Sequence, residues 1–312
     1  MTLLLTKSEV FDLLTVRQAI KLTEAAYNEQ GRRKVEPWAP FVVTDGNYEL
    51  RVNAGGISGL KLAGLRAGMK GGSQIHLYET STGNLLCVAA YPFSYLRVGA
   101  TVGLAVHRLA RRDAKRLLVV GSGRIATVSL EALACLRKFE SIQVFSRSDE
   151  TRQKFVATAR DRLKLEIEAL KEIEPAARKA DVIVLATSAA SPVLKGSWLQ
   201  EGTHVSAAGS RCEVDDETFL RARLVVVSSL EQEEKFNAAP TDNVLQRLAN
   251  SGQLPWDKIR ELGEVATGNV QAPQGITVFR ESQGGFGDLV FAQWIYQQAN
   301  RIGRGQIVDF NG

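Results

Sequence analysis

The sequence has few of the residues that bind metals or form disulfides. Its 312 residues include three cysteines and three histidines. Cys87, Cys135 and Cys212 lie far apart, and no CxxC motif or His/Cys cluster occurs. This pattern indicates neither a zinc site nor a disulfide framework. A protein without a metal, in the reducing cytoplasm, is the simplest interpretation.

Long apolar runs are also missing. The longest weakly polar run, residues 94–110, is interrupted by Arg97 and Arg108 and falls short of the ~18 apolar residues of a membrane helix. Charged residues between Lys7 and Asp12 occupy the place where a secretory signal would be apolar. We therefore expect neither a membrane association nor a signal peptide.

No charge of one sign dominates. There are 39 Lys and Arg against 34 Asp and Glu, and the net charge of +5 is spread along the chain. A nucleic-acid-binding protein usually concentrates its basic residues, so no nucleic-acid partner is predicted, whereas a small anionic ligand would suit this charge. With 45% hydrophobic and 23% charged residues the composition is that of a globular protein. The length favours two domains of about 150 residues each.

The N-terminal part combines helices with short strands. A helix is predicted over residues 7–30. Residues 37–88 contain five β-rich runs separated by turn signals, which predicts an antiparallel sheet: PFVV, YELRV, GLKLAGL, SQIHLYE and LLCVAAY. Ser94 is expected to cap the next helix, which continues to about Leu109.

The pattern changes at residue 113. Short apolar runs alternate with helical stretches, which is typical of a parallel, doubly wound sheet: LLVV, IQVF, DVIVLA, HVSAA and LVVV. The last helical stretch, 287–302, is expected to return to the first domain. We therefore predict an α/β fold with a Rossmann-like domain over 113–287. A discontinuous α+β domain over 1–112 and 288–312 carries the antiparallel sheet.

A glycine motif after the first parallel strand predicts a dinucleotide site. The run GSGRIA (121–126) directly follows LLVV and opens a helix, as the dinucleotide fingerprint requires. The first glycine permits the tight turn, the second lets the backbone approach the pyrophosphate, and the helix N-terminus faces the phosphates. The alternative is a glycine-rich turn in a nucleotide-free domain. The predicted contacts are Gly121, Ser122, Gly123, Arg124 and Ile125.

The end of the second strand bears on the choice of cofactor. NAD sites usually carry an acid about 20 residues after the glycines, which binds the ribose 2′-hydroxyl. Here the strand ends in Ser146, Arg147 and Ser148, and Asp149 comes only later. These three residues could hold a 2′-phosphate, so NADP(H) is favoured and NAD(H) is the alternative. Arg147 could also be a solvated loop residue.

Two basic residues before the glycine motif are candidates for the substrate site. Lys61 interrupts an apolar strand, where it is either exposed or a charge placed in a cleft. Arg97 falls in the first turn of the helix expected to begin at Ser94, where a cation opposes the helix dipole. This cost makes sense if Arg97 holds an anion such as a substrate carboxylate. The alternative is a solvated arginine.

Several segments in order along the chain resemble the ornithine cyclodeaminase/mu-crystallin family. GLKLAG resembles the family's strand with a substrate-contacting lysine, and TGNLLCVA resembles its TG-x-hydrophobic strand. LRVGATVGLAVHRLA resembles the RTAA helix, with Val98 and Gly99 in place of Thr and Ala. VVGSGRIA resembles the family's glycine motif, GaGxQA. Three later segments also resemble signatures of the family: DVIVLATSAASPVL, ELGEVATG and ITVFRESQGGFGD.

The resemblance implies an NAD(P)-binding Rossmann domain and an antiparallel domain that dimerises by joining sheets, with the site in the cleft. Members use NAD(P) on imines or amino acids and include ornithine cyclodeaminase, alanine dehydrogenase and ketimine reductase. By position, Lys61 and Arg97 would contact the imine and carboxylate of the substrate. Thr187 would contact the cofactor.

The chain departs from the family near the substrate. An arginine that many members carry falls at Ala39 or Pro40, and Arg51 on the neighbouring strand could replace it. The Asp that cyclodeaminases carry after the fourth Rossmann strand is replaced by Ser210 and Arg211, as in the mu-crystallin branch. We expect both to contact the substrate.

Two further departures lie near the C-terminus. Glu281 and Gln283 fall on the Ser-x-Gly of the family signature, whereas Asp288 keeps its spacing from Phe279. Asp288 is expected to cap the last helix rather than to take part in the chemistry.

These observations predict an NADP-preferring, homodimeric oxidoreductase that reduces a C=N bond next to a carboxylate. Hydride would pass from nicotinamide C4 to the imine carbon, while Lys61 protonates the nitrogen and Arg97 holds the carboxylate. The substrate would be a small imine or amino acid. The alternatives are a redox-neutral cyclodeaminase with bound NAD, and a nucleotide-dependent binding protein like mu-crystallin.

Overall fold

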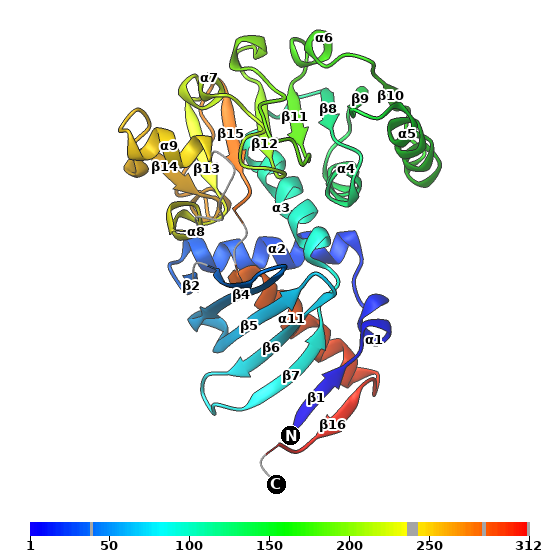
Figure 1. The fold of residues 1–312 in the computed structure, drawn as a ribbon, viewed down its shortest axis with the longest axis vertical. Coiled ribbons are helices and arrows are strands. Elements are labelled where there is room, and N and C mark those ends of the chain that lie inside the picture. Colours follow the sequence, from blue (N-terminus) through cyan, green and yellow to red (C-terminus); the bar gives the residue numbers. More distant parts are fainter. Residues whose placement is uncertain (38–39, 236–242, 283–284, 311–312) are drawn as a thin grey trace.

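A computed structural model describes residues 1–37, 40–235, 243–282 and 285–310. Two eight-stranded sheets are connected by the helix α3 (Ser94–Leu109) (Figure 1). Sheet A has the order β16-β1-β7-β6-β5-β4-β2, with β3 paired to β4. Its strands are β1 (Thr2–Leu5), β2 (Val35–Pro37), β3 (Phe41–Asp45), β4 (Tyr48–Ile57), β5 (Leu62–Met69), β6 (Gly72–Glu79), β7 (Leu85–Ala90) and β16 (Gln306–Val308).

The predicted antiparallel sheet is confirmed for β3 to β7, which pair antiparallel in sequence order. Its far edge was not predicted. There β1 pairs parallel to β7, and β16 pairs antiparallel to β1. Both ends of the chain therefore contribute strands to sheet A.

Sheet B is parallel throughout and has the order β10-β9-β8-β11-β12-β15-β13-β14. The five predicted strands are present, and β15 lies between two of them although the sequence did not predict it. The strands are β8 (Arg116–Val120), β9 (Ser141–Phe145), β10 (Glu168–Ala169), β11 (Val182–Leu185), β12 (His204–Ala207), β13 (Leu224–Val227), β14 (Ile259–Glu261) and β15 (Thr277–Arg280). The predicted fold class is confirmed.

The helix predicted over residues 7–30 is in fact two helices. Thr15 interrupts it, and its hydroxyl accepts the N–H of Gln18 as the N-cap of the second one. The helices are α1 (Lys7–Phe11), α2 (Val16–Gly31), α4 (Arg124–Leu136), α5 (Asp149–Leu163), α6 (Glu174–Ala177), α7 (Asp216–Leu220), α8 (Leu230–Lys235), α9 (Val244–Asn250), α10 (Leu262–Ala266) and α11 (Gly285–Arg301). Single 3-10 turns cover Ser58–Leu60, Gly196–Trp198 and Trp256–Lys258. In the described ranges, no helix has both the length and the apolar composition needed to cross a bilayer.

Helix α3 begins differently from the prediction and packs closely on α4. Its N-cap is Phe93, and Ser94 is the first helical residue without a capping role. A Cβ on Gly99 would lie 2.7 Å from Cβ of Val128 and 2.8 Å from the backbone nitrogen of Ser129. Glycine at this position therefore allows the close approach of the two helices.

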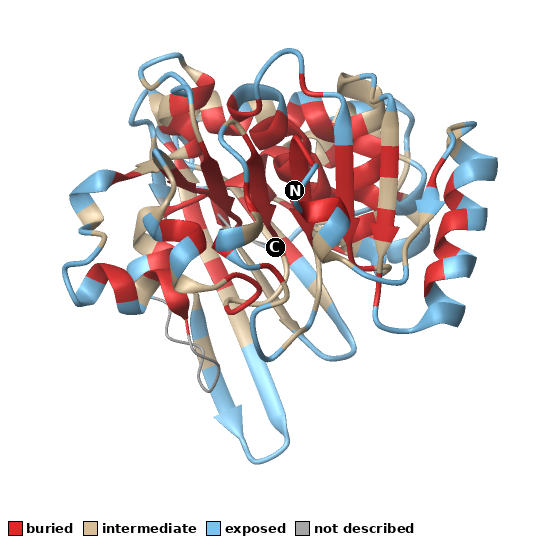
Figure 2. Cartoon of the chain, turned by 90° about the horizontal axis from the view of Figure 1, so that it is seen from above, coloured by how far each residue is buried: buried red, intermediate tan, exposed pale blue. Residues whose placement is uncertain are grey.

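The two sheets are covered to different extents. The central strands of sheet B are buried, with helices on both faces (Figures 1 and 2). Helix α11 covers one face of sheet A, as expected of a last helix that returns to the first domain. A Cβ on Gly64 of β5 would lie 2.9 Å from the Leu289 side chain. The opposite face of β4 to β7 is only partly buried.

Candidate active site

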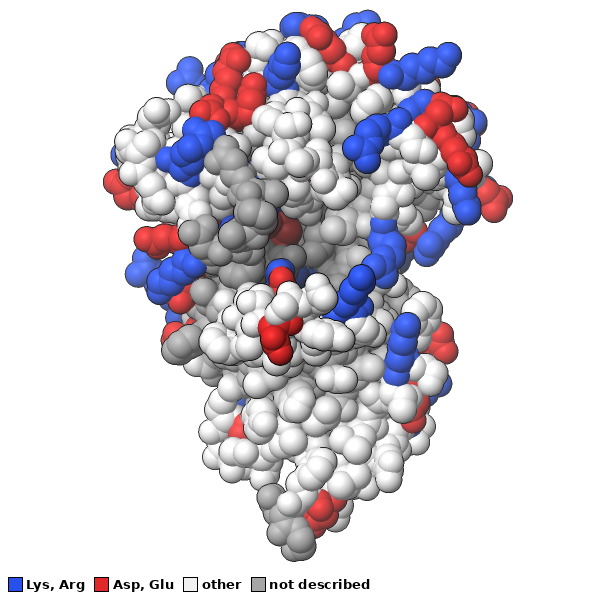
Figure 3. Space-filling view, in the orientation of Figure 1, with Lys and Arg blue, Asp and Glu red and all other residues white. Residues whose placement is uncertain are grey.

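A cleft of about 1040 Å³ lies at the carboxyl ends of β8, β9, β11 and β12. Parallel sheets usually bind their ligands at this edge. The far wall comes from sheet A and the first turn of α3, and the front of the molecule is hollowed between the two sheets (Figure 3). Of the predicted site residues, those that line the cleft are Arg51, Arg97, Gly121, Ser122, Gly123, Arg124, Ile125, Ser146, Arg147, Ser148 and Thr187.

The glycine turn has the geometry of a phosphate cradle. Gly121 has φ +122°, and a Cβ there would lie 2.4 Å from the carbonyl oxygen of Ala186. Gly123 is the N-cap of α4, and a Cβ on it would meet no atom within 4 Å. The space beside Gly123 is therefore open, and Arg124 and Ile125 of the first turn of α4 line the cleft, where a pyrophosphate could approach the free N–H groups of the helix.

The end of β9 carries no free acid. Arg147 is exposed at the rim of the cleft. The two neighbouring serines already have partners: Ser146 donates to the carbonyl of Ser148 at 3.2 Å, and the Ser148 hydroxyl caps α5 through the N–H of Thr151 at 3.3 Å. Asp149 forms an ion pair with Arg152. Among these residues, Arg147 has the side chain that is available to an anionic ligand.

A buried carboxylate ties together the loops after β11 and β12. Glu213 accepts hydrogen bonds from the N–H groups of Thr187 and Gly209, and burial raises the pKa of its carboxyl group. Thr187 and Gly209 both line the cleft. Sequence reasoning did not assign Glu213 a role, because no local pattern shows that these two loops meet.

Ser210 and Arg211 are not among the residues that line the cleft. The Ser210 hydroxyl donates to the carbonyl of Ala189 instead. Burial lowers the pKa of the Arg211 guanidinium, and the charge of Arg51 lowers it further. Arg211 is therefore partly buried outside the lining of the cleft, within electrostatic reach of Arg51.

The prediction that Lys61 lies in a strand is wrong. A 3-10 turn, Ser58–Leu60, precedes β5, so Lys61 is exposed before the strand with φ +54° and does not line the cleft. Arg66, five residues further along β5, lines it instead. At about 3.3 Å per residue these positions are roughly 16 Å apart. An apolar run with two basic residues does not show by itself which one faces the cleft.

Arg97 lines the cleft but is held by two acids of the chain. Its Nη1 lies 3.1 Å from Oε1 of Glu281, and its Nε lies 2.9 Å from Oδ1 of Asp288. All three side chains are almost fully buried. Arg97 is therefore not solvated, and the anions that it contacts in this structure belong to the chain itself rather than to a substrate.

Asp288 does not cap the last helix. It lies within α11 and also contacts Arg66, with its Oδ2 2.8 Å from the Arg66 Nε, and it accepts a hydrogen bond from Tyr91 at 2.9 Å. Burial acts to raise the pKa of Asp288, but the charges of Arg66 and Arg97 outweigh burial and lower it. The carboxylate is therefore ionised. Ala39 and Gln283, the other positions where the chain departs from the family, lie outside the described residues.

The charged side chains that line the described part of the cleft are all positive. Among the described residues that line it there are five arginines and no Asp, Glu, Lys or His: Arg51, Arg66, Arg97, Arg124 and Arg147. In the same part of the chain, no three His, Cys, Asp or Glu residues are grouped as metal ligands would be. This lining suits anionic ligands and chemistry that does not depend on a protein carboxylate.

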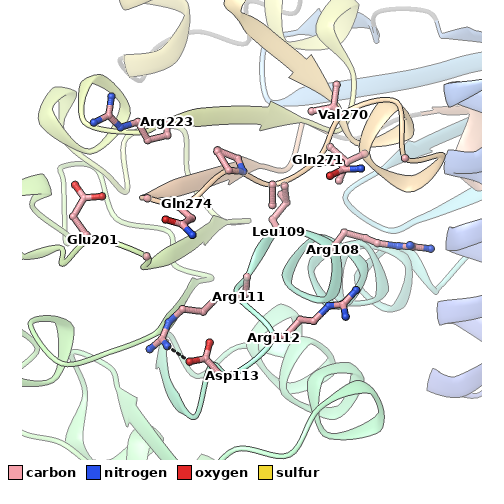
Figure 4. Close-up of a pocket in the computed structure, with 17 residues that line it drawn as sticks. Arg108, Leu109, Arg111, Arg112, Asp113, Glu201, Arg223, Val270, Gln271 and Gln274 are labelled. Atoms are coloured by element: carbon pink, nitrogen blue, oxygen red, sulfur yellow. Dashed lines mark hydrogen bonds and ion pairs between the residues drawn. The ribbon is translucent and has the colours of Figure 1, made fainter.

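A second hollow of about 960 Å³ lies at the opposite edge of sheet B. Four arginines line it, but they point in different directions, and Arg111 contacts Asp113 at 2.7 Å (Figure 4). Arg108 pairs with Glu24. These side chains do not converge on one anion, so the cleft with the glycine turn is the better candidate site.

The chain is similar to several known proteins. A Delta(1)-pyrroline-2-carboxylate reductase of Bacillus cereus is 30% identical over 223 residues, covering 69% of this chain and 67% of the relative. The Thermococcus litoralis Delta(1)-pyrroline-2-carboxylate reductase, solved with NADH and L-proline, has a TM-score of 0.87 at 25% identity, with 98% of this chain and 100% of that chain covered. An archaeal alanine dehydrogenase dimer with bound NAD also has a TM-score of 0.87 at 25% identity, with 99% of each chain covered.

The sequence profile of one family matches nearly the whole chain, over residues 2–302. The resemblance inferred from the ordered motifs is therefore confirmed. The chain belongs to the ornithine cyclodeaminase/mu-crystallin family.

Proposed function

We propose that the protein is an NAD(P)H-dependent oxidoreductase that reduces a C=N bond next to a carboxylate. The observation that carries this proposal is a cleft in which the glycine turn adjoins five arginines, with no acid among the described residues that line it. The pyrroline-carboxylate reductases among its relatives act on such a bond, and two similar structures contain NADH or NAD. When bound, the dinucleotide would supply the hydride.

The residues of the chain would bind and orient the reactants. The turn from Gly121 to Ile125 would hold the pyrophosphate, and Thr187 lies beside it in the cleft. At the sheet A end, Arg51 and Arg66 would bind the substrate. An arginine side chain is not deprotonated at neutral pH, so neither residue replaces Lys61 as the proton donor. We propose that the proton reaches the imine nitrogen from water.

The direct test is oxidation of NADPH and NADH by cyclic imines. We expect turnover with Δ1-pyrroline-2-carboxylate or 1-piperideine-2-carboxylate, measured as loss of absorbance at the nicotinamide band. Binding of both cofactor and imine without turnover would instead support a binding protein like mu-crystallin. Failure to bind either dinucleotide would contradict the proposal.

We expect no proline or ammonia from ornithine with catalytic NAD. A cyclodeaminase needs a base to manage protons, and the described lining of the cleft includes no carboxylate, lysine or histidine. Ser210 and Arg211, which replace the family's Asp, cannot take that role at neutral pH. Proline formation at about one per second or faster, followed by chromatography, would show that the redox-neutral alternative is right.

NADPH should bind more tightly than NADH. The end of β9 offers the Arg147 guanidinium to a 2′-phosphate, and Asp149, two residues further on, is already paired with Arg152. A charge-assisted hydrogen bond contributes about 1.5–3 kcal/mol, so Arg147→Ala should reduce the preference roughly tenfold or more. Calorimetric titration with each cofactor measures this effect.

Arg160→Ala is the matched control for this experiment. Arg160 is an exposed arginine at the other end of α5 and does not line the cleft. Its loss should change both affinities equally. Equal affinities of the unmutated protein for NADPH and NADH would contradict the predicted preference.

We also propose that the protein is a homodimer joined through sheet A. Ala54, Leu65, His76 and Val88 are partners across four strands. They lie on the face opposite the one that α11 covers, since Gly64, beside Leu65, faces α11. The surface over sheet A shows few charged side chains in Figure 3. A broad, weakly charged sheet face of this kind is typical of an interface.

Leu65→Arg should convert the dimer to a monomer. It places a charge in the middle of the uncovered sheet face, where a partner would have to desolvate it. Light scattering at micromolar concentration measures the mass. Leu220→Arg is the control, because Leu220 is 48% exposed on α7, away from sheet A. A monomeric unmutated protein would contradict the proposal.

The predicted domain division is retained as a proposal. Its boundary at residues 112 and 113 falls between α3 and β8, and the boundary at 287 and 288 falls in the first turn of α11. The second boundary is better placed before Gly285, where the helix that packs on sheet A begins.

A further inference from the structure

Two arginines of the cleft share one carboxylate. Asp288 contacts Nε of Arg66 with one oxygen, at 2.8 Å, and Nε of Arg97 with the other, at 2.9 Å. The Tyr91 hydroxyl donates to Asp288, and the Tyr91 ring lies 5.7 Å from the Arg66 guanidinium carbon. Asp288 and Tyr91 therefore restrict the orientation of Arg66, which reduces the entropy that it would lose on binding a ligand.

The two arginines differ in their terminal nitrogens. Nη1 of Arg97 is taken by Glu281, and the Arg97 side chain is only 3% exposed. The terminal nitrogens of Arg66 form no hydrogen bond or ion pair within the described ranges, and its side chain is 11% exposed in the cleft wall. A carboxylate binds arginine best through two parallel N–H bonds. Arg66 can offer such a pair.

The charges around the two arginines also favour Arg66 over Arg97 as the binding partner of a ligand carboxylate. Arg66 and Arg97 carry two positive charges, which Asp288 and Glu281 balance. A ligand carboxylate at Arg97 would meet the Glu281 carboxylate at close range in a buried site, where repulsion between like charges is strong. A carboxylate at Arg66 would meet Arg51 nearby, since Arg51 and Arg66 occupy diagonal positions on the same face of β4 and β5. Arg51 is paired with Glu49 at 2.8 Å, but the Glu49 side chain is 49% exposed, so solvent screens its charge far more than that of the buried Glu281.

We propose that Arg66, and not Arg97, receives the substrate carboxylate. Glu281 keeps Arg97 out of substrate binding, and Asp288 is a positioning residue that acts through Arg66. The inference rests on the proposed function for the identity of the ligand, a small carboxylate next to the reacting bond. It assigns the recognition of that carboxylate to a residue that the sequence did not single out.

The first experiment compares KM for Δ1-pyrroline-2-carboxylate at saturating NADPH. Arg66→Met should raise KM at least tenfold, about 1.4 kcal/mol, and Arg66→Lys should restore part of the loss because it keeps the charge. The double variant Arg97→Met/Glu281→Leu removes one charge of each sign and leaves the Arg66–Asp288 pair. Its KM should stay within about twofold. If the double variant does not fold, Arg97→Lys should likewise leave KM within about twofold.

Asp288→Asn tests the positioning role. Asparagine keeps the shape but weakens the contact with the Arg66 Nε, so KM should rise while kcat changes less. In the Arg66→Met background the same substitution should add no further increase, because the residue through which Asp288 acts is gone. An additional increase in that background would overturn the positioning role.

Binding of L-proline to the enzyme–NADH complex, followed by calorimetry, gives a measurement that needs no turnover. The affinity should fall in Arg66→Met and persist in the double variant. The reverse ranking, or no effect of Arg66→Met, would overturn the assignment even if imines are reduced. The expected ranking without imine reduction would support the assignment and contradict the proposed function. No binding of L-proline to the unmutated complex would overturn the assignment of a carboxylate site.

Discussion

Replacing Arg97 with alanine should lower the free energy of unfolding by about 3–5 kcal/mol. Arg97 is the partner of both Glu281 and Asp288, whose side chains are 1% and 2% exposed. Its removal leaves a buried Glu281 without this compensating charge, and Asp288 keeps only Arg66 as a cationic partner. Urea denaturation followed by circular dichroism measures the change, as a shift of the midpoint at constant slope.

The stability of Arg97→Ala should be compared with that of two other variants. Arg108→Ala removes an ion pair with Glu24 in which both side chains are more than a third exposed, and should cost no more than about 1 kcal/mol. Arg97→Met/Glu281→Leu should be less destabilising than Arg97→Ala, because it removes the Glu281 charge together with that of Arg97, and Asp288 keeps Arg66 as a cationic partner. A stability loss as small for Arg97→Ala as for Arg108→Ala would contradict the role of Arg97 as the centre of a buried charge network.

Gly121→Ala should destabilise the fold. Gly123→Ala should weaken dinucleotide binding but leave the stability of the fold unchanged. Gly121 has φ +122°, which side chains rarely adopt, and its Cβ would lie 2.4 Å from the Ala186 oxygen. The backbone strain alone costs about 1–3 kcal/mol. At Gly123 the Cβ would enter open space beside the start of α4, where the pyrophosphate is expected to approach.

Thermal unfolding and NADPH titration of both variants test the prediction. The melting temperature should fall clearly for Gly121→Ala and stay unchanged for Gly123→Ala. The NADPH affinity of Gly123→Ala should fall on the order of tenfold, about 1.4 kcal/mol. If Gly123→Ala binds NADPH as tightly as the unmutated protein, the pyrophosphate does not pass this glycine and the assignment of the turn is wrong.

Local patterns were enough to predict most elements of both sheets. The five strands predicted in sheet B are short apolar runs, and the strand, glycine turn and helix from Arg116 to Leu136 are contiguous in the sequence. Chain segments whose geometry depends on their own residues and immediate neighbours leave such patterns. Strand β15 was not predicted, and its residues Thr277–Arg280 are held in the sheet by pairing with β12 and β13.

The basic residues of the substrate end show where local reasoning fails. Lys61 and Arg66 stand in the same apolar stretch, and their spacing does not determine which lies in the strand. The 3-10 turn before Lys61 delays the start of β5, so Leu62, Gly64 and Arg66 face α11 while Lys61 stays outside the strand. That outcome depends on how β5 pairs with β4 and on the position of α11.

The fold class, the family and the position of the glycine turn after β8 can be inferred from the sequence alone, because each depends on contiguous or ordered motifs. It also indicated that Arg97 either holds an anion or is solvated, since a cation in the first turn of a helix is otherwise unfavourable. The fold shows that Arg97 is paired, and with which anions. Glu281 is 184 residues away in the sequence, and long-range packing brings it and Asp288 to Arg97. Buried charges must be paired wherever the fold places them, and no local pattern records which partner the fold supplies.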